Sequence, residues 1–358
     1  MPAPPKGKRA FAFGGLGGFN AHGVGFLEAA RELDVRPSII TCTSGMIDWV
    51  ARWLDGEELL PLLRQQIQRS NKFPVPLDWM NSLWISWFGD PGIFRPAVPE
   101  YWRRWMTPFA PDGAQAGDEQ HRRKLAKAFL DRMFPAQLYV PQRGRADVER
   151  IARAMNRSEI PVVFNSFHPA TGLGYLHVNE AGRDFLGVEY GEAGGGDKYL
   201  PIDADAVTAA LWLYFYGFEH ADNPRGLVDG AYNRQFIIRE LYMVDRIYAV
   251  RPINTRWIGT LPANYFEIQD FTTELWFNSA YAAETGQMAL INRLIDEGKL
   301  LDDRFRRVDL TEIQVERQYG YFDFFVEEMA VYERSHRQSL ETLREKEGVA
   351  VAELVEMA

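Results

Sequence analysis

Residues 11–44 read FAFGGLGGFNAHGVGFLEAARELDVRPSIITCTS, and this stretch decides the fold of the chain. A short apolar run at residues 11–13 is followed by a glycine-rich loop at residues 14–18 and then by apolar residues at helical spacing. A second apolar run at residues 39–41 leads to Ser44, after which helical spacing resumes. The stretch therefore predicts a strand, a glycine loop, a helix, a second strand and a serine at a strand-to-helix turn.

This predicted unit brings together two groups that acyl chemistry requires. The glycine loop offers backbone N–H groups that can stabilise an oxyanion, and the turn offers a serine hydroxyl. Transfer of an acyl group to serine needs both a nucleophile and such donors. The stretch is therefore a candidate active site.

Strand-like and helix-like segments alternate along the rest of the 358-residue chain, which favours an α/β layered fold. Predicted strands cover residues 160–165, 174–178, 227–231, 246–250 and 308–316, and predicted helices cover 122–132, 205–216, 272–297 and 322–346. We expect a flexible N-terminal tail at residues 1–9 and one domain at residues 10–358. Within that domain, residues 59–150 are expected to form a helical and aromatic-rich insertion.

The aromatic part of this insertion lies at residues 79–105, which hold five of the ten tryptophans. Three prolines interrupt the stretch, so no long helix is expected there. One interpretation is that the rings pack in the interior. The other is that the stretch forms a lid or wall beside the serine, since an acyl chain needs an apolar trough.

Composition limits the possible functions. The net charge of −9 argues against nucleic acid as a partner, because phosphates demand a basic surface. The single cysteine rules out an intramolecular disulfide and suits a reducing compartment. No apolar run approaches the roughly 18 residues of a membrane-spanning helix, and no signal sequence is evident. We therefore expect a cytoplasmic protein.

The glycine loop has two other interpretations. Residues 15–20 form an imperfect G-x-G-x-x-G, a pattern typical of dinucleotide sites. Such a site needs an acidic residue at the end of the second strand to hold a ribose, but that strand ends in Thr41, Cys42 and Thr43. Asp34 precedes the strand and would lie at its opposite end. The loop could also be a tight turn that only packs.

Ser44 and a downstream aspartate are the candidate catalytic pair. Cys42 and Met46 stand two residues before and after Ser44, where the G-x-S-x-G elbow has small residues. An N-cap serine on the following helix is the alternative interpretation, and we expect Met46 to act as a spacer of the turn and not as a ligand. Asp229 follows a short apolar run and precedes Gly230, so it is either a strand-end carboxylate or an Asx-turn residue.

The histidines do not complete a Ser–His–Asp triad in the hydrolase chain order. In that order the histidine follows the aspartate, and only His336, in a charged helical segment, comes after Asp229. The other five histidines precede Asp229, and none has metal-ligand spacing. The sequence therefore predicts neither a metal site nor a triad.

A glycine loop, a serine elbow and a distant Asp-Gly-Ala without a triad histidine together resemble the patatin-like acyl hydrolases. The resemblance covers residues 10–58 and 160–255. It implies a three-layer α/β/α sandwich with a mainly parallel central sheet. It also implies a serine–aspartate dyad, with Ser44 as nucleophile and Asp229 as its partner. The implied oxyanion hole consists of Gly15, Leu16, Gly17, Gly18 and Gly45.

Several positions depart from the family pattern. Asn20 stands where the third loop glycine belongs, and Cys42 and Met46 replace both elbow glycines. No arginine occupies the loop, and residues 233–235 lack the Asn-x-Pro that often follows the aspartate. Two alternatives therefore stay open, a non-catalytic lipid- or partner-binding protein and an acyltransferase that uses the same dyad.

The resemblance implies a lipid acyl-ester substrate, peripheral contact with a membrane and no cofactor. In the expected reaction Asp229 accepts the proton of Ser44, which attacks the ester carbonyl and forms an acyl-enzyme. An aspartate is a weak base in water, so burial must raise the pKa of Asp229 for it to serve.

Overall fold

A computed structural model describes most of the domain. The described residues are 7–18, 20–70, 94–97, 103, 106, 119–133, 137, 139–194, 196–218, 220–258, 261–263, 265–300, 305–315 and 329–348. Most of the predicted N-terminal tail and nearly all of the aromatic stretch at residues 79–105 lie outside them, so the predicted lid is neither supported nor contradicted.

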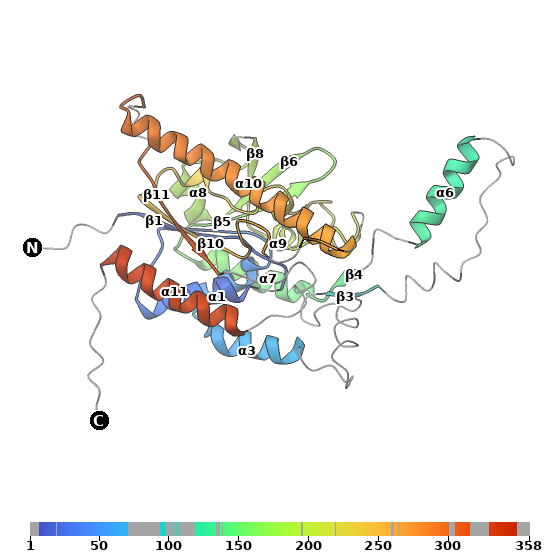
Figure 1. The fold of residues 1–358 in the computed structure, drawn as a ribbon, viewed down its shortest axis with the longest axis horizontal. Helices are drawn as coiled ribbons and strands as arrows, with labels where there is room; N and C mark the ends of the chain where they lie inside the picture. Colours follow the sequence, from blue (N-terminus) through green and yellow to red (C-terminus); the bar gives the residue numbers. More distant parts are fainter. Residues whose placement is uncertain are drawn as a thin grey trace, which may run out of the picture.

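The described strands form a nine-stranded central sheet and a separate two-stranded one (Figure 1). The central strands are β1 (Arg9–Phe13), β2 (Ile39–Cys42), β5 (Val162–His168), β6 (Leu173–Val178), β7 (Ala193–Gly194), β8 (Asp197–Pro201), β9 (Val228–Asp229), β10 (Arg246–Arg251) and β11 (Asp309–Gln314). Their order is β11-β10-β1-β2-β5-β6-β8-β7, with β9 on β5, and most neighbours are parallel. The pair β3 (Phe94–Pro96) and β4 (Tyr139–Pro141) is antiparallel.

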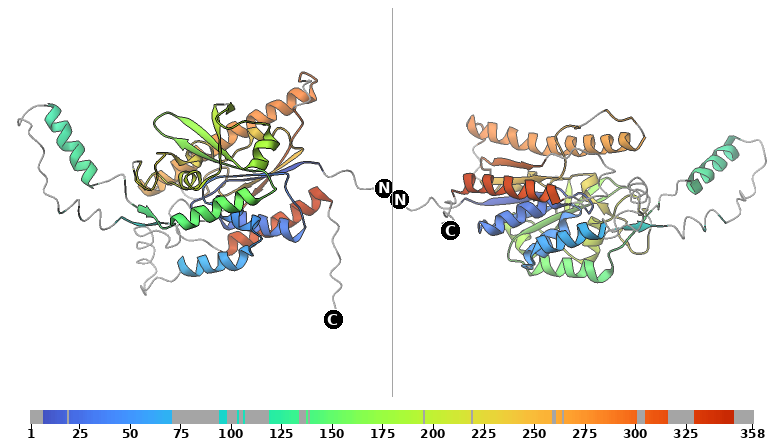
Figure 2. Two further views of the ribbon diagram at one scale, coloured as in Figure 1. Left: turned by 180° about the vertical axis from the view of Figure 1, so that it is seen from behind. Right: turned by 60° about the horizontal axis from the view of Figure 1, so that its bottom comes forward.

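Helices cover both faces of this sheet (Figure 2). The described helices are α1 (Ala21–Glu32), α2 (Met46–Leu54), α3 (Leu59–Ser70), α6 (Glu119–Met133), α7 (Arg145–Arg157), α8 (Glu180–Leu186), α9 (Ala204–Ala210), α10 (Tyr265–Asp296) and α11 (Met329–Glu347), with 3₁₀ turns η1 (Gly230–Tyr232) and η2 (Arg239–Leu241). All of these helices except α6 contribute to the covering of the sheet. The predicted α/β class with a mainly parallel sheet is confirmed.

Alternation along the buried strands divides the core into two parts. Phe11 and Phe13 of β1 face one side, where they pack with α1, α2, α3, α7, α9 and α11. Ala10 and Ala12 face the other side, which α8, η2 and α10 cover. Because successive strand residues point to opposite faces, a strand buried on both sides reads as the continuous apolar run seen in the sequence.

The pairing of β5 brings two distant segments together. One edge of β5 pairs with β6 along most of its length, whereas β2 takes the other edge only at residues 162–164. β9 pairs with β5 just beyond that point, at Ser166 and Phe167. The end of β2 and the end of β9 therefore meet on the same side of β5, which places Ser44 and Asp229 in one region.

One predicted helix is shorter than expected. Residues 205–216 have helical apolar spacing, but α9 ends at Ala210 and turns follow. Trp212 and Tyr216 leave the helix to pack with Val228 in a small separate core. The carbonyl of Trp212 then accepts the N–H of Asp229 at 2.9 Å, so the early helix end helps to hold β9.

Most other boundaries agree with the sequence to within a few residues. α10 is one long helix over the region predicted as one or two, and it begins at Tyr265, ahead of the predicted start at residue 272. The described part of α11 begins at Met329, so the predicted start at residue 322 lies outside the described residues. α3 packs against α1 and α2, and α7 against α2 and α9, so both ends of the predicted insertion at residues 59–150 join the domain. Much of its middle lies outside the described residues, and the insertion itself stays a prediction.

Candidate active site

The serine turn has the backbone of a strained elbow. Ser44 follows β2 by two residues and precedes α2, and its φ is +52°. Asp34 is the other non-glycine residue of the described chain with a positive φ. A non-glycine residue in this region is held there at a cost of about 1–3 kcal/mol, and such strain concentrates at functional sites.

The elbow and the glycine loop are in backbone contact. A Cβ atom on Gly15 would overlap the carbonyl oxygen of Thr43, and one on Gly45 would overlap the carbonyl oxygen of Gly17. Only glycine allows the two loops to approach this closely. These two glycines therefore fix the position of the loop N–H groups beside Ser44.

The structure divides the predicted oxyanion donors into two groups. The N–H of Gly15 donates to Thr43 Oγ1 at 3.2 Å, and the N–H of Leu16 donates to Asn20 Oδ1 at 3.0 Å. Both are thus engaged inside the protein. No acceptor within the described residues engages the N–H groups of Gly17, Gly18 or Gly45, and Gly17 and Gly45 line the same cavity as Ser44.

Asn20, which departs from the glycine pattern, has a structural role. Besides accepting from Leu16, its side chain donates to the carbonyl of Gly17 at 2.9 Å. One amide thus closes the loop on both sides of its bend. The sequence showed that Asn20 departs from the glycine pattern. It did not indicate that the Asn20 side chain would hold the loop in place through two hydrogen bonds.

Asp229 is a buried carboxylate beside this elbow. It is 1% exposed, and its Oδ1 accepts the N–H of Ala231 at 2.9 Å. Burial raises the pKa of Asp229 to about 7, opposed by hydrogen bonding from the Ser44 hydroxyl and from Ala231. Its Oδ2 has no hydrogen bond of ordinary geometry among the described residues, so the Ser44 contact is loose, as is common before a substrate binds.

This arrangement combines the two interpretations of Asp229. One carboxylate oxygen caps the 3₁₀ turn η1, as an Asx-turn residue does, and the other is left for Ser44. The structure thus brings together both predicted catalytic residues, from ends of strands that are far apart in the sequence.

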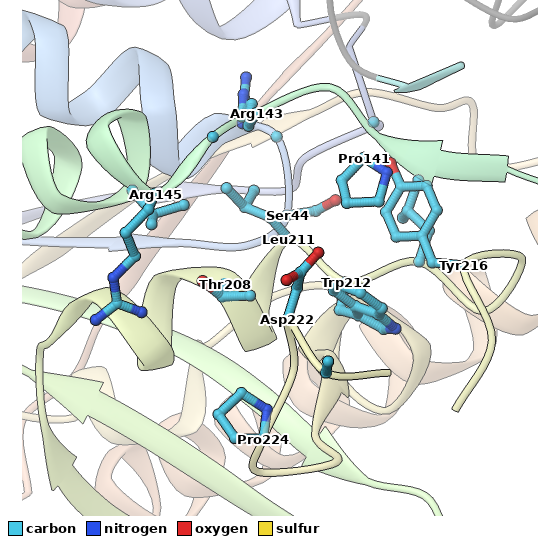
Figure 3. Close-up of a pocket in the computed structure, with 16 residues that line it drawn as sticks. Ser44, Pro141, Arg143, Arg145, Thr208, Leu211, Trp212, Tyr216, Asp222 and Pro224 are labelled. Carbon is cyan, nitrogen blue, oxygen red and sulfur yellow. The ribbon is translucent and has the colours of Figure 1, made fainter. Parts of the chain in front are cut away.

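A cavity of about 370 Å³ opens on Ser44 (Figure 3). Its described lining is mainly apolar and consists of Gly17, Ser44, Gly45, Pro141, Arg143, Gly144, Arg145, Val148, Thr208, Leu211, Trp212, Leu213, Tyr216, Ala221, Asp222 and Pro224. Figure 3 shows Trp212 and Tyr216 on one side of Ser44, and Arg145 extending away from it. The volume falls in the range of small-molecule sites, about 300–1,000 Å³.

A second buried aspartate, Asp48 of α2, lies four residues after Ser44. Its carboxylate binds Arg52 at 3.3 Å, Arg143 at 3.0 Å and Arg150. Burial alone would raise the pKa of Asp48, but the three arginine charges outweigh that effect and lower it. The sequence analysis missed this cluster. Of the three partners, only Arg52 stands at a spacing that a sequence pattern can reveal, the i,i+4 position on the helix.

The two unusual elbow residues are part of the core. Met46 and Cys42 are fully buried, and neither lines the cavity. Met46 packs against Gly23 of α1, where a Cβ would overlap the methionine thioether. The methionine therefore fills space that a glycine on the neighbouring helix leaves open. Burial also raises the pKa of the Cys42 thiol, so this cysteine is unreactive.

Histidines are absent from the described lining of the cavity. His22 contacts the carbonyl of Gly14 at 2.9 Å, and His177 contacts Ser166 Oγ at 2.8 Å, where burial lowers its pKa to about 3. His336 lies on α11, 3.3 Å from Glu32. In the described part of the chain no three His, Cys, Asp or Glu side chains are placed to hold a metal ion.

Among the described helices, none combines the length and hydropathy needed to cross a bilayer. Comparison with known protein families gave no matching family model. A search of curated proteins gave no significant match either.

Proposed function

We propose that the protein is a serine acyl hydrolase that cleaves lipid acyl esters with a Ser44–Asp229 dyad, in a patatin-like three-layer fold. One observation carries the proposal: a buried carboxylate, which has no cationic partner among the described residues, faces a strained serine beside backbone N–H groups that no described acceptor engages. Titratable groups with strongly shifted pKa values are typical of active sites. Ser44 lines the cavity, and Asp229 is buried next to Ser44 without being one of the lining residues.

The reaction proceeds in two steps. Asp229 accepts the Ser44 proton as Ser44 Oγ attacks the ester carbonyl, and the resulting oxyanion receives hydrogen bonds from Gly17, Gly18 and Gly45. Collapse of the tetrahedral intermediate expels the alcohol, which takes the proton from Asp229 and leaves an acyl-enzyme. Water then attacks the acyl group while giving a proton to Asp229, and that proton returns to Ser44 as the fatty acid leaves.

Each part of this reaction has support in the geometry. A pKa of about 7 makes Asp229 a far better base than an ordinary aspartate at neutral pH. Each oxyanion donor is typically worth about 3–4 kcal/mol in the transition state. The apolar wall around Leu211 and Trp212 suits an acyl chain. The proposal requires no cofactor.

The expected setting follows from the same substrate class. A lipid ester lies at a membrane surface, so peripheral contact with a membrane is part of the proposal. A lone, buried cysteine suits a reducing compartment, and we propose the cytoplasm.

The test is hydrolysis of p-nitrophenyl butyrate by the full chain, with the acyl-enzyme followed by intact-protein mass. The proposal predicts turnover and a transient acyl adduct in the wild type and neither in Ser44→Ala. An adduct released only when an alcohol acceptor is added would indicate an acyltransferase. A wild-type chain that forms no adduct would indicate the non-catalytic alternative and refute the proposal.

A further inference from the structure

Thr43, the residue before the nucleophile, makes contacts that the mechanism above does not use. It is fully buried, and its Oγ1 donates to the carbonyl of Gln235 at 2.7 Å. The same oxygen accepts the N–H of Gly15 at 3.2 Å. One hydroxyl therefore joins the glycine loop to the segment that follows Asp229, while its backbone leads directly into Ser44.

Only a hydroxyl can make both bonds, because it donates one hydrogen and keeps lone pairs to accept another. The backbone of Thr43 adds to the junction, since its N–H donates to Phe13 at 3.1 Å. Three segments that carry the nucleophile, the oxyanion donors and the general base thus converge on a single buried residue.

Thr41 provides an internal comparison. It lies two residues earlier in β2, on the same face of the strand. Its Oγ1 donates to the carbonyl of Ile237 at 3.0 Å, so it binds the same segment after Asp229. No described contact joins its side chain to the glycine loop. The two threonines therefore differ in the one contact that concerns the oxyanion donors.

We propose that Thr43 is a positioning residue. Its hydroxyl fixes the position of the glycine loop, and with it the oxyanion donors, relative to Asp229. This inference rests on the proposed hydrolase function. Loss of the hydroxyl leaves the Gly15 N–H and the Gln235 carbonyl buried without their partner. A loop displacement of about 1 Å is enough to lower a rate about 100-fold, and substrate binding in the apolar cavity is left intact.

The experiment compares Thr43→Val, Thr43→Ser and Thr41→Val in the full chain. With p-nitrophenyl butyrate, Thr43→Val should lower kcat about 100-fold and leave KM within about threefold. Thr43→Ser should recover most of the rate, and Thr41→Val should keep kcat near the wild-type value. Equal loss of kcat in Thr41→Val and Thr43→Val would overturn the proposal, because a general loss of β2 packing would then explain both.

A second readout is independent of activity. Amide hydrogen exchange followed by NMR should show the Gly15 amide losing protection in Thr43→Val and retaining it in Thr43→Ser and Thr41→Val. Unchanged exchange at Gly15 in Thr43→Val would refute the link itself. If Thr43→Val does not fold, hydrogen exchange in the wild-type chain provides the test. The Gly15 amide should then exchange more slowly than the amides of Gly17 and Gly18, and equal exchange rates would overturn the proposal.

The two readouts separate two kinds of failure. Protection of Gly15 that depends on Thr43, in a chain that hydrolyses no ester, would refute the hydrolase function and the positioning role while leaving the hydrogen-bond link intact. Hydrolysis that is insensitive to Thr43→Val would refute the positioning role alone.

Discussion

Asp48 and Asp229 are both buried aspartates close to Ser44, yet their surroundings give them opposite properties. Three arginines surround Asp48 and lower its pKa, so it is a fixed negative charge. In the described part of the chain Asp229 has no cationic partner, and burial raises its pKa to about 7. Its remaining contacts are a backbone N–H and the Ser44 hydroxyl.

The difference shows how one residue type serves structure in one place and chemistry in another. A buried charge that is fully paired anchors the elements that supply its partners, here α2, α7 and the loop before α7. A buried carboxyl without a cation remains able to exchange a proton near neutral pH. We therefore expect substitutions at the two sites to separate stability from activity.

The largest expected effect is on hydrolysis. Asp229→Asn removes the proposed base and should lower kcat at least about 1,000-fold, as loss of a triad residue does in serine proteases. Asp48→Asn, in protein that remains folded at the assay temperature, should change kcat only about threefold or less. The double variant Ser44→Ala/Asp229→Asn should lose little more than either single variant, because the pair acts as a unit. Equal losses of kcat in Asp48→Asn and Asp229→Asn, measured with p-nitrophenyl butyrate, would contradict the different roles assigned to the two aspartates.

The second effect runs in the opposite direction. Asp48→Asn leaves arginines without their counter-charge and should lower the free energy of unfolding by about 3 kcal/mol. Asp229→Asn, which replaces an unpaired buried carboxyl, should cost little at pH 7. Urea unfolding of both variants measures the difference, and a greater loss in Asp229→Asn than in Asp48→Asn would contradict the assigned roles.

A third prediction concerns Met46, a core residue of the elbow. Met46→Gly leaves a cavity against Gly23 and places a second glycine at the start of α2, so it should lower the free energy of unfolding by about 3 kcal/mol. Met46→Leu, which nearly conserves volume, should cost less than about 1.5 kcal/mol. Thermal unfolding compares them. Increased esterase activity in Met46→Gly without loss of stability would instead show that the methionine only crowds the turn.

The smallest effect between neighbouring conditions, one pH unit apart, is the pH dependence of stability. The pKa of Asp229 is about 3.9 in the unfolded chain and about 7 in the folded one. Between these values the unfolded state releases the proton while the folded state retains it. Stability from this group therefore falls as pH rises from about 4 to 7, by at most about 1.4 kcal/mol per pH unit. Unfolding curves at pH 5, 6 and 7 should show this slope in the wild type relative to Asp229→Asn, and parallel curves would contradict it.

The sequence predicted the parts of the site that follow from strand ends. Ser44 and Asp229 each stand at the end of a short apolar run. They meet because β2 is parallel and β9 antiparallel to β5, a pairing that the sequence alone does not show. Local patterns also indicated the glycine loop, although the same residues allowed a dinucleotide site or a tight turn that only packs.

Contacts between distant segments were beyond the reach of such patterns. Arg143 and Arg150 come to Asp48 from about a hundred positions away, and nothing local marks them as its partners. From the sequence, Met46 is a departure from the elbow pattern. The residue that makes room for its side chain, Gly23, lies on another helix and could not be identified from local spacing. The predicted helix extended to Tyr216 because the helical apolar spacing continues to that residue. In the structure α9 ends at Ala210, since Trp212 packs with Tyr216 and Val228 outside the helix.

The most direct test of the central claim is the rate at which a fluorophosphonate labels Ser44 as a function of pH. If Asp229 is the base, only its deprotonated form activates the serine. The labelling rate should therefore rise with pH, with an inflection near 7, and this inflection should vanish in Asp229→Asn but persist in Asp48→Asn. A wild-type rate that does not change between pH 5 and 9, or an inflection that survives in Asp229→Asn, would contradict the account.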